Sequence, residues 1–307
     1  MHPAFSIILF TTLSGLGYGL AAVLGLGLLD PSAMATKIAH VLALLLIAGG
    51  LMSSTLHLGN PQRAWRALSQ WRSSWLSREG VMAIVSFLPL LYSAWLSVVE
   101  GRYSALWGLI GTALCVVTVY CTAMIYASLK SVQAWHTRLT PLCYLLFAAA
   151  GGFILASFFA FAASGQTVLL SLLAVLFIIG AWIAKTRWRM RMRMMVPLST
   201  PETATGLGNI GHVRLLERPH VTENYLTNEM GFKVARKHAE KLWRIALITG
   251  GIVPVILLAA LVLFGTDDGF STFVAGSAVL SFYVGMLVER WLFFAEARHA
   301  VMNYYGG

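Results

Sequence analysis

The sequence predicts an all-α, polytopic integral membrane protein with eight transmembrane helices. Of its 307 residues, 58% are apolar and 11% are charged, whereas a soluble globular protein carries about a quarter charged residues. Apolar stretches of about 20 residues, the length that crosses a bilayer as a helix, recur along the whole chain. None of them alternates as the strands of a membrane barrel do, which leaves helices as the only spanning structure.

The eight expected spans follow one another with polar segments between them, and each contains small residues, as packed membrane helices do. The first span has no basic segment ahead of it and no small-residue cleavage pattern, so we expect it to be retained. The whole chain, 1–307, is expected to form a single membrane domain with one basic cytoplasmic loop at 186–243. The spans cover residues 5–29, 38–58, 81–99, 104–129, 141–164, 167–186, 244–264 and 272–293.

The distribution of basic residues predicts the orientation. Twenty of the 22 lysines and arginines follow spans two, four, six and eight or end them, while the other face has only Lys37 and Arg102. By the positive-inside rule, both termini are therefore cytoplasmic. The net charge of +10 is then explained by membrane orientation and contact with anionic lipid, so membrane lipids and no nucleic acid are expected as partners.

Side chains suited to chemistry gather where span two ends and span three begins. Residues 53–66 include His57, Gly59 and Arg63, and Glu79 opens span three at the same membrane face. Reduction of a quinone needs a hydrogen-bond donor, a titrating group and an entrance from lipid. His57 suits the first two roles near neutral pH, Glu79 could relay protons, and Arg63 could hold that carboxylate or a quinone carbonyl. An ordinary interface of tryptophans and snorkelling arginines is the alternative interpretation.

Further residues could contribute to this pocket or to the docking of a partner. Arg66, Trp75 and Arg78 lie in or beside the same loop. Every even-numbered span ends on this face, so span eight does too. On that ground alone, Tyr283 and Arg290 are candidates to line the pocket. No metal is expected, because the three cysteines are isolated and form no CxxC pair.

Haem, transport and a purely structural role are the competing interpretations. A haem between helices needs two histidines at matching depth, but His40 and His57 lie at opposite ends of span two, about 25 Å apart at 1.5 Å per residue. No haem is therefore expected. A transporter would need ionisable groups at mid-depth or paired broken helices, which the sequence does not offer. A structural anchor would tolerate the loss of His57 and Glu79.

Two motifs carry a family resemblance. The segments 56–64, Leu-His-Leu-Gly-Asn-Pro-Gln-Arg-Ala, and 75–79, Trp-Leu-Ser-Arg-Glu, resemble the membrane-anchor subunits of dimethyl sulfoxide reductase-type molybdoenzymes, with support from Tyr126, Trp135-His136 and Thr140-Pro141. The resemblance covers essentially the whole membrane domain.

This resemblance implies a multi-pass subunit of the bacterial inner membrane that carries no haem or metal. Such a subunit exchanges electrons between the quinone pool, ubiquinone or menaquinone, and an iron–sulfur subunit that serves a molybdopterin catalytic subunit. The histidine, glycine, arginine and glutamate of the family's quinol site match His57, Gly59, Arg63 and Glu79.

Two branches of that family fit differently. The segments 213–220, 228–238 and 289–299 resemble the anchor of the cytoplasmic sulfite-oxidising enzyme, a sulfite:quinone oxidoreductase. The dimethyl sulfoxide reductase branch holds its catalytic subunits outside the cytoplasmic membrane, whereas the charge distribution places His57 inside. The resemblance therefore implies catalytic partners on the cytoplasmic side, and a menaquinol-oxidising anchor of a dimethyl sulfoxide or related S/N-oxide reductase remains the alternative.

Overall fold

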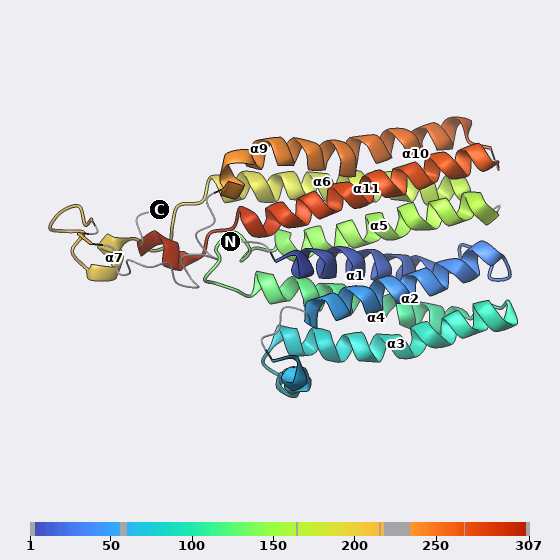
Figure 1. Cartoon of the computed structure of the whole chain (residues 1–307), viewed down its shortest axis with the longest axis horizontal. Coiled ribbons are helices and arrows are strands. Elements are labelled where there is room, and N and C mark those ends of the chain that lie inside the picture. The colour runs from blue at the N-terminus through green and yellow to red at the C-terminus, as the bar shows by residue number, and fades with distance from the viewer. Residues whose placement is uncertain are drawn as a thin grey trace.

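The computed structural model describes residues 4–55, 60–163, 165–214, 216–217, 234–266 and 268–304. Long helices lie along one axis, and both termini of the protein lie at the same end of the bundle, which we call the termini end (Figure 1). Eight helices of the described part are long and apolar enough to cross a membrane, and no described residue belongs to a strand. The predicted fold class is confirmed.

The first six spanning helices are α1 (Phe5–Leu24), α2 (Met34–Thr55), α3 (Trp75–Glu100), α4 (Ala105–Ala127), α5 (Leu139–Ala163) and α6 (Thr167–Arg193). The seventh consists of α9 (Val234–Leu247), the π-helical turn η2 (Ile248–Ile252) and α10 (Val253–Phe264), and the eighth is α11 (Gly269–Ala295). Outside this set, the described residues form three short helices: η1 (Pro61–Gln70), α7 (Pro201–Thr205) and η3 (Ala300–Tyr304).

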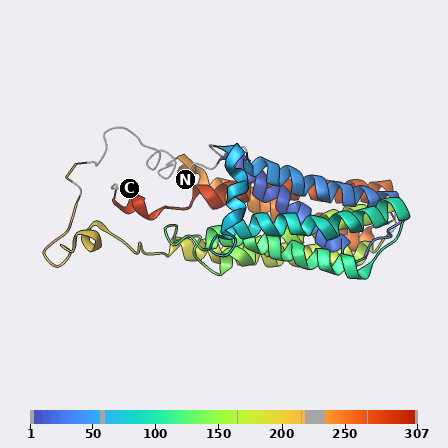
Figure 2. The same cartoon turned by 90° about the horizontal axis from the view of Figure 1, so that it is seen from below.

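Two helices extend further than the hydropathy pattern predicts. The basic run after residue 186 continues α6 to Arg193, and residues 234–243 already belong to the seventh helix. The connection between these two helices is therefore 194–233, shorter than the predicted loop at 186–243. Its described part, 194–214 and 216–217, projects beyond the termini end of the bundle together with the C-terminal segment (Figure 2).

The seventh helix passes a proline by means of the π-helical turn. Pro254 has no N–H to donate to Gly250, four residues earlier. The indole Nε1–H of Trp182 on α6 donates to that carbonyl oxygen instead, at 2.9 Å. A backbone acceptor inside lipid is thus satisfied by a neighbouring helix, and α9 and α10 continue as one rod (Figure 1).

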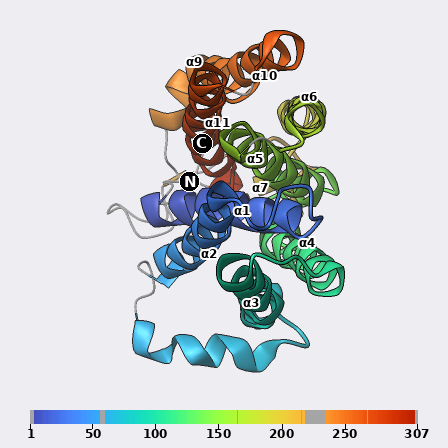
Figure 3. The ribbon, with the colours of Figure 1, turned by 90° about the vertical axis from the view of Figure 1, so that its right-hand side faces the viewer.

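Helix α1 lies in the middle of the bundle, and a view along the bundle shows α2, α4, α5 and α11 around it (Figure 3). Glycines permit the closest approaches: Gly19 lies against the backbone of Gly152 on α5, and Gly25 against that of Gly108 on α4. A Cβ atom at these positions would overlap the facing backbone, as in other close crossings between membrane helices.

The η1 helix lies across the bundle at its flank, beside α3 (Figure 3). Arg78 on α3 fastens it there, because its guanidinium donates to the carbonyl oxygens of Trp71, at 3.0 Å, and Arg72, at 2.7 Å. Ser74 caps the start of α3 by accepting from the N–H of Ser77. The sharp turn from η1 into α3 thereby brings Glu79 into the bundle rather than onto its surface.

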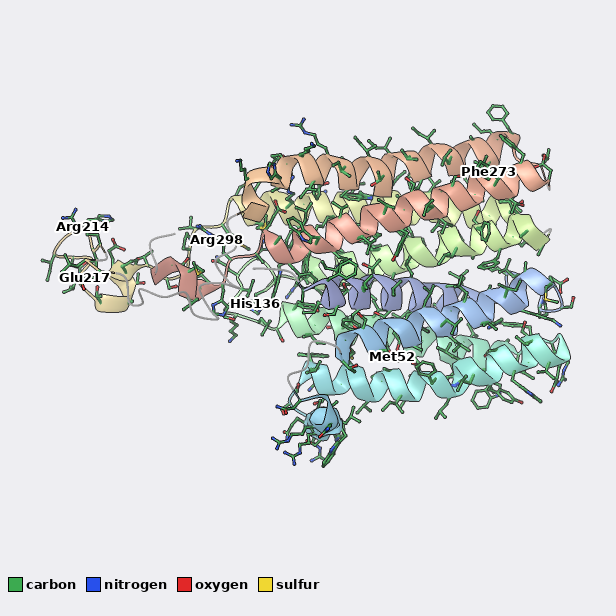
Figure 4. The ribbon with its side chains drawn as sticks, viewed as in Figure 1. Met52, His136, Arg214, Glu217, Phe273 and Arg298 are labelled. Carbon is green, nitrogen blue, oxygen red and sulfur yellow. The ribbon has the colours of Figure 1, made fainter. Side chains whose placement is uncertain are left out.

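Side chains mark the two ends of the bundle (Figure 4). His136 and Arg298 lie at the termini end, and Phe273 lies at the far end. Arg214 and Glu217 lie further out, on the segment that follows α7. Arg63 and Arg66, before α3, and Arg290, near the end of α11, therefore share the termini end of the bundle.

Candidate functional site

Glu79 is a buried carboxyl group near the start of α3. Its side chain is 5% exposed, and the Oγ1 hydroxyl of Thr122 on α4 donates to its Oε1 at 2.7 Å. No lysine or arginine in the described part of the protein forms an ion pair with it. A buried carboxylate is costly unless it is paired and hydrogen-bonded. In the described part of the protein, a negative charge on Glu79 is therefore compensated only by the hydrogen bond from Thr122.

A small polar cavity adjoins the Glu79–Thr122 pair. Helices α1, α4, α5 and α11 enclose it, and its volume of about 20 Å³ suffices for about one water molecule. Thr122 lines it, together with Thr12, Tyr18 and Tyr144, whose buried hydroxyl groups have no hydrogen-bond partner in the described residues. A water molecule there would satisfy several of these hydroxyls at once.

The depth of the cavity follows from the residues of α1 that line it. They begin at Thr11 and end at Tyr18, which are 6 and 13 residues beyond the first residue of α1. At 1.5 Å per residue the cavity therefore lies about 10–20 Å inside the termini end of the helix. It is a polar site within the hydrocarbon layer, and Glu79 lies on the side nearer to the termini end.

A buried ion cluster also adjoins this cavity. Arg290 lines the cavity, and its Nε lies 3.1 Å from Oε2 of Glu289. The other carboxylate oxygen of Glu289 lies 2.6 Å from Nζ of Lys185 on α6. The Arg290 guanidinium also stacks over the ring of Tyr144, at 4.0 Å from its centroid. Two cations thus share one carboxylate, which leaves one excess positive charge beside the cavity.

A second ion cluster joins three helices nearer to the termini end. Arg189 on α6 lies 2.9 Å from Glu296, which follows α11, and 3.3 Å from Glu240 on α9. Arg193, one turn further along α6, also pairs with Glu240. Arg189 lies over the ring of Trp243 at 4.4 Å. Two arginines of the basic run of α6 thus form ion pairs that hold α6, α9 and the end of α11 together.

The predicted site residues are not all placed. His57 and Gly59 lie outside the described residues, so their positions stay predictions. Arg63 is exposed on η1, and no ion pair joins it to Glu79 in the described part of the protein. Arg66 is likewise exposed on η1, where it lies over the ring of Trp65.

The other candidates divide between packing and the cavity. Trp75 packs edge-to-face on Tyr120 at 5.9 Å, and Arg78 donates to the backbone of Trp71 and Arg72, just after η1. Tyr283 is half-buried on α11 and is absent from the lining of the cavity, whereas Arg290 lines it. Among the described residues, no three His, Cys, Asp or Glu side chains form a group that could hold a metal ion.

The sequence motif after α4 has a packing role. Trp135 stacks on Phe293 of α11, with 5.4 Å between ring centroids, and its Nε1–H donates to the Phe293 carbonyl oxygen at 3.0 Å. Tyr126 packs against Trp135 and Tyr144, and Thr140 donates to the Trp135 carbonyl oxygen. These residues join the connection between α4 and α5 to the end of α11, next to Arg290.

Sequence reasoning missed several residues that build the site. Lys185 falls at the end of the sixth expected span, where a lysine is typical of the lipid headgroup layer, but it occupies a buried position on the same helical stripe as Ile178 and Ala181. That periodicity, i, i+3 and i+7, is the signal that could have placed it. Tyr18 and Tyr144 lie in apolar segments where nothing in the sequence distinguishes them from aromatic core residues.

Fold and site together define a polytopic helical membrane subunit whose polar centre and basic surface both lie at the termini end. A family model described as "DMSO reductase anchor subunit (DmsC)" matches residues 1–295. The protein belongs to this family of membrane anchor subunits of oxidoreductases.

Three relatives show how far the likeness extends. The protein is 32% identical to the C subunit of sulfite dehydrogenase from Allochromatium vinosum, over 99% of both proteins. It is 33% identical to the YnfH protein of an anaerobic dimethyl sulfoxide reductase from Escherichia coli, over 37% of this protein and 40% of that one. It is 28% identical to the C component of the anaerobic dimethyl sulfoxide reductase from Escherichia coli, over 48% of this protein and 54% of that one.

Proposed function

We propose that this protein is the quinone-reactive anchor of a molybdopterin and iron–sulfur oxidoreductase that passes electrons to the membrane quinone pool during sulfite oxidation. The observation that carries the proposal is the buried, hydrogen-bonded Glu79 carboxyl group beside a polar cavity inside a membrane bundle. A polar centre of this kind is costly in lipid and is characteristic of a functional site. The full-length likeness to the sulfite dehydrogenase component of Allochromatium vinosum supports sulfite as the electron source.

The chemistry requires protons and electrons to meet at the ring. Reduction of a quinone takes up two electrons and two protons, one pair for each carbonyl oxygen. A cavity of about 20 Å³ is too small for the ring, so the ring is proposed to bind on the termini side of Glu79. There His57, Gly59 and Arg63 would complete the site. Glu79 would then donate a proton to the ring and regain one from the termini end.

The buried ion cluster would assist by electrostatics. Electrons that arrive before protons leave negative charge on the quinone, and a cation in a low-dielectric site stabilises that charge. Lys185 and Arg290 exceed Glu289 by one positive charge, and Arg290 faces the cavity. This arrangement favours reduction of a quinone near the cavity over a site without charge.

Orientation and partners follow from the charge distribution. The termini end carries nearly all of the basic residues, so we propose that it faces the cytoplasm of a bacterial cell, with the protein in the inner membrane. The iron–sulfur subunit would dock over this basic face and carry electrons from the molybdopterin subunit. The anchor itself would contribute the quinone site and hold no haem or metal.

A second candidate is a menaquinol-oxidising anchor of a dimethyl sulfoxide reductase. It is favoured by the family description and by the two Escherichia coli relatives. Those two matches each cover less than half of this protein, whereas the sulfite dehydrogenase match covers nearly all of it. Sulfite oxidation is therefore the first proposal.

The test compares membranes that contain the whole complex with membranes that lack this protein. Sulfite-dependent reduction of a ubiquinone or menaquinone analogue should require it. Quinol-dependent reduction of dimethyl sulfoxide, without sulfite activity, would select the second candidate. If neither activity depends on the protein and it does not co-purify with an iron–sulfur subunit, the quinone-reactive anchor is the wrong function.

A further inference from the structure

A second feature lies on the flank of the bundle opposite α3 and η1 (Figure 3). An apolar groove runs between α6 on one side and the turn η2 with α10 on the other, and its volume is about 550 Å³. Ile179, Ile183, Ile252 and Ile256 line it with exposed side chains. The groove therefore opens outward, toward the surface that faces lipid, and is separate from the cavity beside Glu79.

The interior of the groove offers almost no polar group. Trp182 lies along it, but the indole N–H of this residue already donates to the carbonyl oxygen of Gly250. The lining extends from Ile178 to Arg187 on α6, which is about 13 Å at 1.5 Å per residue. A quinone ring needs donors for its carbonyl oxygens and finds no free donor between Ile178 and Ile183, since Thr186 and Arg187 lie only at the end of the groove. A saturated or unsaturated hydrocarbon tail needs only the apolar walls.

Two arginine side chains lie where the groove reaches the termini end. Arg187 is part of its lining and is exposed. Arg244 on α9 is also exposed, and it lies three and seven residues before Leu247 and Gly251, on the same helical side as these two lining residues. The neighbouring Arg189 and Arg193 are paired with carboxylates, but no carboxylate pairs with Arg187 or Arg244 in the described part of the protein.

We propose that this groove binds one anionic phospholipid, with an acyl tail against α6 and α10 and the phosphate group on Arg187 and Arg244. Basic pockets between membrane helices recognise anionic head groups at the membrane surface in this way. The site would hold the seventh helix against α6 at the π-helical turn, where the helix has given up a regular backbone hydrogen bond. The proposal does not depend on the quinone site.

The test uses the purified complex in mild detergent. Phospholipid that remains bound is extracted and counted per protein by mass spectrometry. The delipidated complex is then titrated with dioleoyl-phosphatidylglycerol or dioleoyl-phosphatidylcholine while its thermal unfolding is followed. The wild type should retain anionic lipid and be stabilised by phosphatidylglycerol at lower concentration than by phosphatidylcholine.

Two variants separate charge from shape, and a third is the control. Arg187→Gln should weaken binding of phosphatidylglycerol about five-fold, since one surface cation contributes about a factor of five to attraction of an anionic lipid. Ile179→Trp should lower the binding of both lipids by filling the groove without a change in charge. Lys130→Gln removes the same charge from the same end of the bundle, at an exposed position outside the lining of the groove, and should bind phosphatidylglycerol as the wild type does.

Three results would overturn the proposal. One is equal affinity of the wild type for the two lipids, and another is unchanged phosphatidylglycerol binding in both Arg187→Gln and Ile179→Trp. The third is retention of a quinone, lost in Ile179→Trp, in place of phospholipid. Because Arg187 is exposed, Arg187→Gln is expected to fold as the wild type does. The comparison of Arg187→Gln with Lys130→Gln therefore remains valid even if Ile179→Trp is unstable.

Discussion

In the ion cluster of Lys185, Glu289 and Arg290, loss of the carboxylate should destabilise the protein more than loss of one cation. Glu289 receives two cations, at 2.6 Å and 3.1 Å, and all three side chains are at most 3% exposed. Glu289→Gln leaves two buried cations without a carboxylate, so we expect a loss of about 3–5 kcal/mol in the free energy of unfolding. Lys185→Met leaves the Glu289–Arg290 pair intact and removes one charge-assisted contact, so we expect a loss of about 1.5–3 kcal/mol.

The assay is unfolding of the purified protein in mixed micelles, titrated with a denaturing detergent and followed by tryptophan fluorescence. Arg191→Met is the matched control, because it removes a cation from α6 at an exposed position six residues from Lys185 and outside the lining of the apolar groove. It should change the unfolding free energy by less than about 0.5 kcal/mol. The reasoning is refuted if Lys185→Met costs as much as Glu289→Gln, since the shared carboxylate would then not be the centre of the cluster.

Three further predictions concern the framework of the bundle. Trp135→Ala should cost about 3–5 kcal/mol, because the stack on Phe293 and the hydrogen bond to its carbonyl are lost; unchanged unfolding would show that this contact does not fasten α11. Gly19→Val should reduce the yield of folded protein in membranes, since its side chain would overlap the backbone of α5, and a normal yield would contradict that close approach. The N–H of Ser271 holds the pKa of Asp268 below its ordinary value of 3.8, so the helix cap of α11 stabilises at neutral pH and is lost as the pH falls below 3.8. The stability difference between the wild type and Asp268→Ala should therefore shrink in acid, and a difference that grows there would refute the cap.

Hydropathy alone predicted the eight helices, because a lipid-exposed helix must be apolar over its full length. It does not locate the ends of helices that continue past the lipid. The basic run after residue 186 indicates that the sixth helix continues into the headgroup layer, but the sequence does not show that Arg189 and Arg193 pair with carboxylates beyond α11 and on α9. These partners are distant in sequence, so the ion pairs that extend α6 are visible only in three dimensions.

In the candidate site, too, some residues were predicted from the sequence and others are recognised only in the structure. Glu79 was predicted from its type and place at a helix start, and Arg290 from parity, and the structure places both beside the same polar cavity, Glu79 through Thr122. Tyr18 and Tyr144 could not be predicted, because a hydroxyl matters here only through the helices that enclose it. The role of His57 stays a prediction from the sequence and the family resemblance.

The most direct test of the proposed quinone chemistry is the rate of sulfite-dependent quinone reduction by the complex that carries Glu79→Gln. The amide keeps the size of the side chain and can still contact Thr122, but it cannot deliver a proton. We expect a fall of about 100-fold or more in turnover, the range of general acid–base assistance, with normal assembly of the complex. Glu100→Gln is the matched control, since Glu100 ends the same helix at the far end and pairs only with Arg102 in the described part of the protein. Turnover of Glu79→Gln equal to that of Glu100→Gln would contradict a proton-transfer role for Glu79 and with it the proposed site.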